Sequence, residues 1–320
     1  MGSILRVQNI SRKYRLNNWM FGRNNTIDAI DNISFELQQG KTLAIVGESG
    51  SGKSTLARQL VGIERPSSGQ VFIDERPVYE LTEAKRKTLF LQVRMIFQNP
   101  FASLNPRLRI GSILEEPLII NTSLNANQRR DKVESVLQKV GLRAEHARRF
   151  PHMFSGGQRQ RIAIARALIL EPKVIVADEP LSALDVSVQA QILNLLLALQ
   201  EEFQISYVFI SHDLGVVEHI ADQVLVMYRG QVMEYGDVEQ IFDTPKHPYT
   251  QTLFASTPIF RDRVTIQTVR GYTSRSATAI QANGCPFAKR CPCATEQCTT
   301  ETPKTRNISG QLITCHSPLL

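Results

Sequence analysis

No cysteine occurs in the first 284 residues of this 320-residue sequence, and no apolar run is long enough to cross a bilayer. A membrane-spanning helix needs about 20 consecutive apolar residues, whereas the longest runs here, LNLLLAL and SYVFIS, have the length of core segments. The N-terminal MGSILRVQNISRKYR lacks the apolar stretch of a secretory signal, so we expect an unexported protein. A reducing cytoplasm argues against disulfides and favours free thiols or metal ligands for the 5 cysteines.

The sequence also lacks a segment dominated by charge of one sign. Its formal net charge is +7, but the densest basic segment, residues 129–149, interleaves acidic residues and repeats apolar ones at helical spacing. This pattern favours a solvated helix face, and the charge is too evenly spread to choose between nucleic acid and an anionic membrane surface as a partner. The 42% apolar content is enough to bury a substantial core, in one domain or one domain with an appendage.

The clearest motif lies at residues 41–56, KTLAIVGESGSGKSTL, where a short apolar strand leads into a GxxxxGKS loop and then a helix. Glycines allow backbone amides to curl round a nucleotide phosphate, and the helix N-terminus adds a positive dipole. Lys53 is expected to reach the β and γ phosphate oxygens and Ser54 to ligate Mg²⁺. The predicted nucleotide-binding residues of this loop are Gly47, Ser49, Gly50, Ser51, Gly52, Lys53, Ser54 and Thr55.

A second apolar segment, KVIVADEP at residues 173–180, ends in two carboxylates. Its composition predicts a strand buried on both faces of a parallel sheet, and ligands bind beyond the carboxyl ends of such strands. We expect Asp178 to hold Mg²⁺ through water and Glu179 to polarise the attacking water. The alternative is an acidic pair that caps the next helix.

Between these segments lies FSGGQ at residues 154–158, which opens a segment with apolar residues at helical spacing. It resembles the signature motif, usually LSGGQ, of the ATP-binding cassette (ABC) family. The phosphate loop, VIVADEP, SALD and ISHD accompany it in the family's order, so the resemblance covers residues 4 to about 240. Phe154 departs from the usual leucine but is also apolar. The resemblance implies that the nucleotide is ATP and that the protein is an ATPase.

The signature segment is suited to bind an anion, because a hydroxyl and two glycines precede a helix N-terminus. A single γ-phosphate is already held by Lys53, so this second cradle requires another nucleotide. The resemblance implies that two cassettes meet head to tail and that each signature closes over the ATP of the other. The residues assigned to this cradle are Ser155, Gly156, Gly157 and Gln158.

Three further residues take their roles from the resemblance alone. Gln98, in MIFQNP, is similar to the glutamine that senses the γ-phosphate and Mg²⁺. His212, in FISHD, resembles the switch histidine that contacts the γ-phosphate and orients the water. Asp185, in SALD, resembles the aspartate of the loop that crosses between cassettes. Gln98, His212 and Glu179 are thus the expected catalytic group.

An aromatic residue near the N-terminus is expected to stack on adenine. Tyr14 is the candidate because it precedes the first hairpin, as the family's aromatic does. Packing of this ring between strands is the alternative. The polar insertion at residues 16–25 also carries Trp19 and Phe21, and either could compete for the base.

The resemblance and the residue patterns together predict an α/β fold. It is an ABC-type P-loop NTPase with a RecA-like core, an antiparallel β subdomain, an inserted helical subdomain and a small cysteine-rich C-terminal extension. The nucleotide-binding domain is expected at residues 1–243, with the helical subdomain at about 100–165. The extension is expected at 244–320, with its cysteine-rich tail at 284–320. Strands are predicted at 43–47, 71–74, 93–97, 173–178, 206–211 and 223–228, with a hairpin at 228–230 and a helix at 187–203.

Two further segments narrow the family resemblance. NPFASLNPRLRIGSILEEPL at 99–118 and the HPYT-containing TPKHPYTQTLFASTP at 244–258 resemble segments of oligopeptide and dipeptide importer ATPases, in the peptide/nickel group. The single cassette without fused membrane spans points to a separate subunit that docks on membrane partners. Peptide is the expected cargo, with nickel, glutathione and cationic peptides left open. A nucleic-acid-associated ABC ATPase is the remote alternative, so no nucleic-acid partner is expected.

The resemblance also implies a set of partners. The segment before Ala29 is most similar to the second of the two ATPase subunits of such importers, so we expect a heterodimer with the other ATPase subunit. Two membrane permease subunits should dock on the helical subdomain, and an extracytoplasmic peptide-binding protein should act indirectly. The protein is then peripheral, on the cytoplasmic face of the inner membrane.

The cysteines are crowded into the last 36 residues. Four thiolates from irregular backbone suit either tetrahedral zinc or a four-iron, four-sulfur cluster, and unliganded thiols remain possible in principle. The resemblance to the cysteine-bearing end of peptide-importer ATPases favours the 4Fe-4S cluster, in a structural role. The expected ligands are Cys285, Cys291, Cys298 and Cys315, with Cys293 as an alternative to Cys291.

Overall fold

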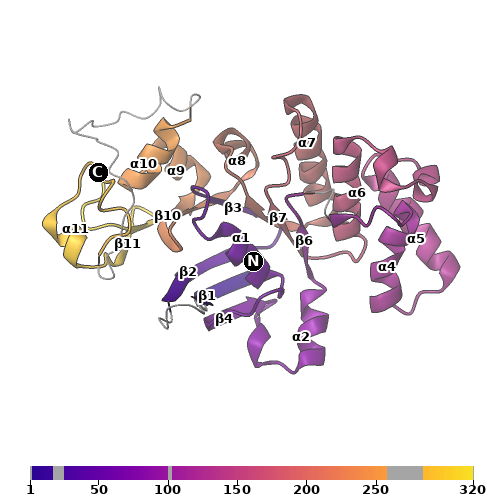
Figure 1. The fold of residues 1–320 in the computed structure, drawn as a ribbon, viewed down its shortest axis with the longest axis horizontal. Helices are drawn as coiled ribbons and strands as arrows, with labels where there is room; N and C mark the ends of the chain where they lie inside the picture. The colour runs from indigo at the N-terminus through magenta and orange to yellow at the C-terminus, as the bar shows by residue number, and fades with distance from the viewer. Residues whose placement is uncertain (1, 17–24, 100–102, 258–283, 320) are drawn as a thin grey trace.

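An eight-stranded sheet forms the centre of the protein in a computed structural model that describes residues 2–16, 25–99, 103–257 and 284–319 (Figure 1). The strand order is β11-β12-β10-β9-β3-β8-β7-β6, in which β9 to β6 run parallel and β10, β12 and β11 continue antiparallel. Every residue of β3, β7 and β8 is buried, as expected of strands covered on both faces. The strands are β3 (Thr42–Val46), β6 (Val93–Ile96), β7 (Val174–Asp178), β8 (Ser206–Ile210), β9 (Gln223–Tyr228), β10 (Gln231–Asp237), β11 (Thr305–Ile308) and β12 (Gln311–Thr314).

A second, four-stranded antiparallel sheet has the order β2-β1-β4-β5. Its strands are β1 (Ser3–Leu16), β2 (Asn25–Gln38), β4 (Ser68–Ile73) and β5 (Arg76–Pro77). The strands predicted from the sequence include only the β4 region of this sheet. The 14-residue strands β1 and β2 are not among them. The reason is local: Asn9 and Asn32 have positive φ, and the register shifts between Val7 and Ile10, which interrupts the two-residue alternation of a regular strand.

Helices cover the large sheet and gather at one end of the molecule. Figure 1 shows α4, α5 and α6 grouped beyond β6, whereas the C-terminal elements lie at the opposite end beyond β10. Across the residues that the structure describes, no helix combines the length and apolar character needed to span a membrane. The α-helices are α1 (Lys53–Leu60), α2 (Glu83–Phe90), α4 (Ile110–Asn121), α5 (Ala126–Lys139), α6 (Gly156–Leu168), α7 (Val186–Phe203), α8 (Leu214–Ile220), α9 (Val238–Asp243), α10 (Pro248–Ala255) and α11 (Glu296–Thr300).

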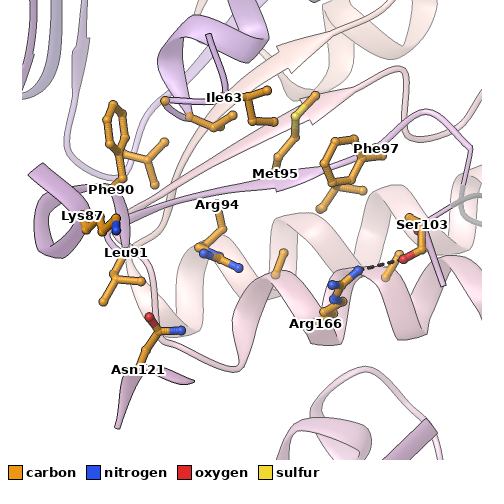
Figure 2. A pocket seen from close by; sticks show the side chains of 16 residues that line it. Ile63, Lys87, Phe90, Leu91, Arg94, Met95, Phe97, Ser103, Asn121 and Arg166 are labelled. Carbon is orange, nitrogen blue, oxygen red and sulfur yellow. Dashed lines mark hydrogen bonds between the residues drawn. The ribbon is translucent and has the colours of Figure 1, made fainter. Parts of the chain in front are cut away.

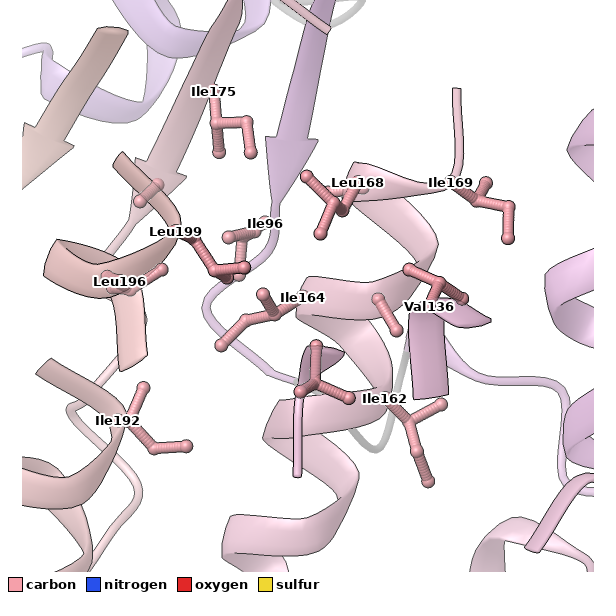
Figure 3. Close-up of a cluster of buried hydrophobic side chains, with 14 of the residues drawn as sticks. Ile96, Val136, Ile162, Ile164, Leu168, Ile169, Ile175, Ile192, Leu196 and Leu199 are labelled. Atoms are coloured by element: carbon pink, nitrogen blue, oxygen red, sulfur yellow. The ribbon is translucent and has the colours of Figure 1, made fainter. Parts of the chain in front are cut away.

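A continuous apolar core joins the helical end to the sheet. Figure 3 shows Ile96 of β6 near Ile164 of α6, with Leu196 of α7 on one side and Val136 of α5 on the other. Ile96, Ile164 and Leu196 are at most 1% exposed. Close packing of these side chains connects α6 to the end of β6, which Gln98 follows in the chain.

The C-terminal residues pack on the same sheet. In β10, Glu234 is fully buried, and its carboxylate accepts hydrogen bonds from the backbone N–H groups of Lys246 (2.7 Å) and His247 (3.1 Å). Burial raises the pKa of Glu234, against the lowering effect of these two hydrogen bonds. His247 caps α10 by accepting a hydrogen bond from Tyr249 N at Nδ1 (2.9 Å), and burial lowers its pKa to about 4. The HPYT segment is thus a buried helix start, beyond the turn that Pro248 alone would predict.

Candidate functional site

The phosphate loop lies between β3 and α1, as the sequence predicts. Lys53 is 6% exposed, and its Nζ donates hydrogen bonds to Gly47 O (2.8 Å), Glu48 O (3.0 Å) and Ser51 Oγ (3.3 Å). Burial lowers the pKa of Lys53, opposed by the negative charges of Glu179, Asp178 and Glu48. An ammonium held inside a loop of backbone amides provides a positive site for phosphate.

Glycine is required at the first position of this loop. Gly47 has φ of 148°, and a Cβ atom there would collide with the carbonyl oxygen of Met227 in β9. Because β9 and β3 are paired strands, the loop passes directly over the adjacent strand end. Any side chain at Gly47 would therefore displace the loop.

Two carboxylates face this loop from the end of β7. Ser54 Oγ donates a hydrogen bond to Asp178 Oδ1 at 3.4 Å. Burial raises the pKa of Asp178; the Ser54 hydrogen bond lowers it and the charge of Glu179 raises it again. A hydroxyl and a carboxylate side by side form the oxygen donor set that Mg²⁺ prefers, so the residues present fit the predicted metal.

Glu179 contacts both other members of the expected catalytic group, Gln98 and His212. Its Oε2 accepts a hydrogen bond from Gln98 Nε2 (2.7 Å) and lies 3.4 Å from His212 Nδ1. The backbone of Glu179 has φ of 45°, a left-handed conformation that is strained for a residue with a side chain, and its N–H donates to Ile210 O. The structure thus brings Gln98, Glu179 and His212 together beside Asp178.

The signature segment begins α6 as predicted. Ser155 and Gln158 form a reciprocal capping box, in which Ser155 Oγ accepts from Gln158 N (3.3 Å) and Gln158 Oε1 accepts from Ser155 N (3.1 Å). A Cβ at Gly157 would lie 2.5 Å from Val188 Cγ1, so glycine there keeps α6 close to α7. Asp185 is the N-cap residue of α7 and makes no side-chain cap.

A cavity of about 1030 Å³ adjoins the phosphate loop. Residues from distant parts of the chain line it: the phosphate loop between Ser49 and Thr55, Thr26 and Asp31 of β2, Glu179 after β7, Arg229 and Gln231 at the β9–β10 hairpin, and Cys285 and Lys289 of the tail. In the part of the chain that the structure describes, the signature residues and Tyr14 do not line this cavity. Neither the cysteine pattern nor the HPYT segment indicates that the tail lines the nucleotide cavity.

The ring of Tyr14 is engaged elsewhere in this structure. Its hydroxyl donates to the Glu64 carboxylate, and the guanidinium carbon of Arg12 lies 4.8 Å from the ring centroid. Adenine stacking on Tyr14 stays a prediction. The competing candidates, Trp19 and Phe21, lie outside the described residues.

A second cavity, of about 490 Å³, lies between β6, α2 and α6 (Figure 2). Its rim carries the exposed apolar side chains of Ile63 and Phe97, which are 57% and 42% exposed. Arg94 points into it, and Arg166 donates a hydrogen bond to Ser103 O at 2.7 Å. Burial and then the charge of Arg166 lower the pKa of Arg94. The cavity is thus cationic inside and apolar at its rim.

The tail thiols are neighbours without forming a metal site. Cys285 N donates to Cys298 O (2.8 Å), and burial raises the pKa of Cys291 to about 12 and that of Cys315 to about 11. Cys285 and Cys291 both pack against the apolar cluster that includes Phe287. Within the described ranges, however, no three His, Cys, Asp or Glu side chains are arranged to hold a metal ion. The four-thiol donor set suits the predicted cluster, but the side chains do not converge on it.

Comparison with known proteins agrees with the geometry. Residues 30–182 match the family model described as "ABC transporter", and residues 233–298 match the model described as "Oligopeptide/dipeptide transporter, C-terminal region". The chain is 49% identical over 316 residues to a di/tripeptide transport ATP-binding protein, DppF, of Pseudomonas aeruginosa, covering 99% of this chain and 98% of the relative. It is 48% identical over 312 residues to the dipeptide transport ATP-binding protein DppF of Escherichia coli, covering 98% and 93%.

A solved structure shows the same cassette fold. The ATP-binding cassette MJ0796, described as a dimer in a post-hydrolysis state bound to ADP and Pi, superposes with a TM-score of 0.65. It is 29% identical and covers 73% of this chain and 98% of its own. The fold, the phosphate loop and the near full-length similarity agree that the protein is an ATPase. The chain belongs to the family of ATP-binding subunits of dipeptide and oligopeptide ABC transporters.

Proposed function

We propose that this protein hydrolyses ATP to drive the import of dipeptides and oligopeptides through a membrane permease. The observation that supports it most directly is the placement of Lys53 and Ser54 opposite Asp178 and Glu179. Phosphate-binding, metal-binding and proton-accepting groups then surround one reacting phosphate. The 49% identity to a di/tripeptide transport protein supports peptide as the cargo.

Each residue of the site has a distinct role in this proposal. The loop from Gly47 to Thr55 binds the phosphates. Ser54, Gln98 and, through water, Asp178 would hold Mg²⁺, which would neutralise charge developing on the phosphates. Glu179 accepts a proton from the attacking water, and His212 orients that water and contacts the γ-phosphate. Gln98 links Glu179 to the segment that leads to the second cavity, through its 2.7 Å hydrogen bond.

A second cassette completes the site in this proposal. The residues from Ser155 to Gln158, with Asp185, face the ATP of a partner ATPase subunit, and the partner's signature faces the phosphate loop of this chain. We propose a heterodimer because the segment before Ala29 resembles that of the second of two ATPase subunits. We propose the nucleotide-binding domain at residues 1–243, its helical subdomain at about 100–165, and the extension at 244–320.

The second cavity is proposed as the docking site for the permease. The exposed Ile63 and Phe97 offer apolar contacts, and Arg94 offers a partly desolvated cation. A permease helix that carries apolar side chains and one carboxylate fits this chemistry. Docking there places the protein peripherally on the cytoplasmic face of the inner membrane, with the peptide-binding protein on the far side.

The substitution Ile63→Asp tests this docking site. Loss of the apolar contact of Ile63 and desolvation of the new carboxylate in the interface should lower ATP-dependent dipeptide uptake about tenfold or more in vesicles that contain the permease and partner ATPase. Binding of ATP to the isolated chain should be unchanged, because Ile63 does not line the nucleotide cavity. Lys85→Asp is the control, since Lys85 is exposed on α2 outside the docking cavity. Equal uptake by both variants would contradict the docking site.

We also propose that the tail thiols of Cys285, Cys291, Cys298 and Cys315 bind a 4Fe-4S cluster, with zinc as the competing metal. Protein purified without oxygen should contain about four iron and four sulfide per chain. Cys298→Ser should lose them, and comparison of Cys291→Ser with Cys293→Ser identifies which of these two thiols is a ligand. A content of one zinc per chain would indicate a zinc site instead of the cluster. Absence of metal from the wild-type chain would contradict the proposal.

A further inference from the structure

Arg290 of the tail forms a two-pronged ion pair with Glu48 of the phosphate loop. Its Nη1 donates to Glu48 Oε2 and its Nη2 to Glu48 Oε1, both at 2.7 Å. These residues are 242 positions apart in the chain. Bidentate pairs of this type fix orientation as well as distance, which a single point contact does not.

The guanidinium of Arg290 is held in place by aromatic side chains. Its Cζ lies 5.6 Å from the ring centroids of both Tyr228 and Phe287, and Nη1 also donates to the Tyr228 hydroxyl at 3.3 Å. Phe287 is fully buried and Tyr228 is 3% exposed. A side chain restrained in this way loses little rotamer freedom on pairing with Glu48.

A second contact holds the backbone of the same loop residue. The Tyr249 hydroxyl accepts a hydrogen bond from Glu48 N–H at 3.0 Å, and Tyr249 is fully buried. Its ring packs against Tyr228 and Phe287, with centroids 4.6 Å and 5.2 Å away. Arg290 therefore binds the side chain of Glu48, and Tyr249 binds its backbone. Both residues contact the same aromatic side chains, Tyr228 and Phe287.

The position of Glu48 bears directly on the phosphate-binding lysine. Glu48 O accepts a hydrogen bond from Lys53 Nζ at 3.0 Å. The adjacent Ser49 and Gly50 line the nucleotide cavity, as do Cys285 and Lys289 of the tail. A shift of Glu48 would therefore move both the ammonium and the amides that meet the phosphates.

We propose that Arg290 and Tyr249 are positioning residues of the ATP site, which hold the phosphate loop in its binding geometry through Glu48. This inference rests on the proposed nucleotide site. The C-terminal extension then contributes to ATP affinity without touching the chemical step.

The test measures ATP affinity and hydrolysis of full-length variants. Arg290→Met and Glu48→Gln should each raise the Kd for ATP about three- to tenfold, and Tyr249→Phe about threefold. The KM for ATP should rise in parallel, while kcat at saturating ATP stays within about twofold of wild type. The double variant Arg290→Met, Glu48→Gln should bind ATP no more weakly than the weaker-binding single variant, because both substitutions remove the same contact. Arg290→Lys should have a Kd for ATP between those of wild type and Arg290→Met, because an ammonium cannot form the two parallel hydrogen bonds of a guanidinium.

Arg6→Met is the matched control, since Arg6 also pairs with a carboxylate, Glu75 (3.0 Å), and lies 4.1 Å over an aromatic ring, that of Phe72. It should leave the Kd unchanged. The inference would be overturned if Arg290→Met and Tyr249→Phe bound ATP as tightly as wild type. It would also be overturned if the losses of ATP affinity added in the double variant. In both cases the wild type and the control must still bind ATP. Failure of wild-type protein to bind ATP would overturn the proposed site itself. If Arg290→Met does not fold, Glu48→Gln and Tyr249→Phe still decide the outcome.

Discussion

Replacing Glu179 with glutamine should lower kcat for ATP hydrolysis by about 10²- to 10⁴-fold, the usual contribution of a positioned general base. The amide keeps the shape of the side chain and remains within reach of Gln98 and His212, which contact Oε2 at 2.7 Å and 3.4 Å. It cannot accept a proton from water. ATP binding should therefore persist, and the two cassettes should remain closed around the nucleotide.

The measurement compares hydrolysis rates and ATP binding in the assembled transporter. Glu171→Gln is a suitable control, because Glu171 is an exposed carboxylate paired with Lys132 at 2.7 Å, away from the nucleotide cavity. It should hydrolyse ATP at the wild-type rate. Near-normal hydrolysis by Glu179→Gln, with a wild-type or similarly disabled partner, would contradict the role of Glu179 as the base.

The substitution Glu234→Ala should lower the free energy of unfolding by about 2 to 4 kcal/mol. The fully buried carboxylate accepts hydrogen bonds from two backbone N–H groups, those of Lys246 and His247. Alanine would leave both donors without an acceptor in a site that water does not reach. Burying an unsatisfied donor costs more than an average hydrogen bond contributes.

Urea unfolding of the full chain measures this loss. Glu239→Ala is the control, since Glu239 is exposed in α9, only five residues further along the chain. It should change stability by less than about 0.5 kcal/mol. A loss in Glu234→Ala no larger than in the control would show that the backbone of the HPYT segment finds other acceptors.

The sequence carried most of the information about the cassette site. The phosphate loop, Asp178, Glu179 and His212 follow buried parallel strands, and the ends of such strands meet at one edge of a sheet. The predicted strands agree with β3, β6, β7, β8 and β9 within a few residues. Their continuous apolar runs made them recognisable, because both faces of each strand are covered.

The contacts of the tail were beyond prediction from the sequence. Arg290 and Glu48 are 242 residues apart, and neither stands in a pattern that indicates pairing. Strands β11 and β12 are four residues long, too short for a periodic signal. Strands β1 and β2 were not predicted, because bulges and asparagines with positive φ interrupt the two-residue alternation of their side chains. These features depend on tertiary neighbours, which local residue patterns do not encode.

The pairing of β12 with β10 also governs how the large sheet ends. Without β12, the backbone of Glu234 and Tyr235 in β10 would be open to hydrogen bonding by another chain, and open edge strands promote aggregation. The tail instead terminates the sheet with β11, whose sequence TRNI is short, polar and mostly exposed. Such a strand is a poor template for further pairing. Residues 305–314 thus cover the edge of β10 with a short strand that offers little backbone for pairing with another chain.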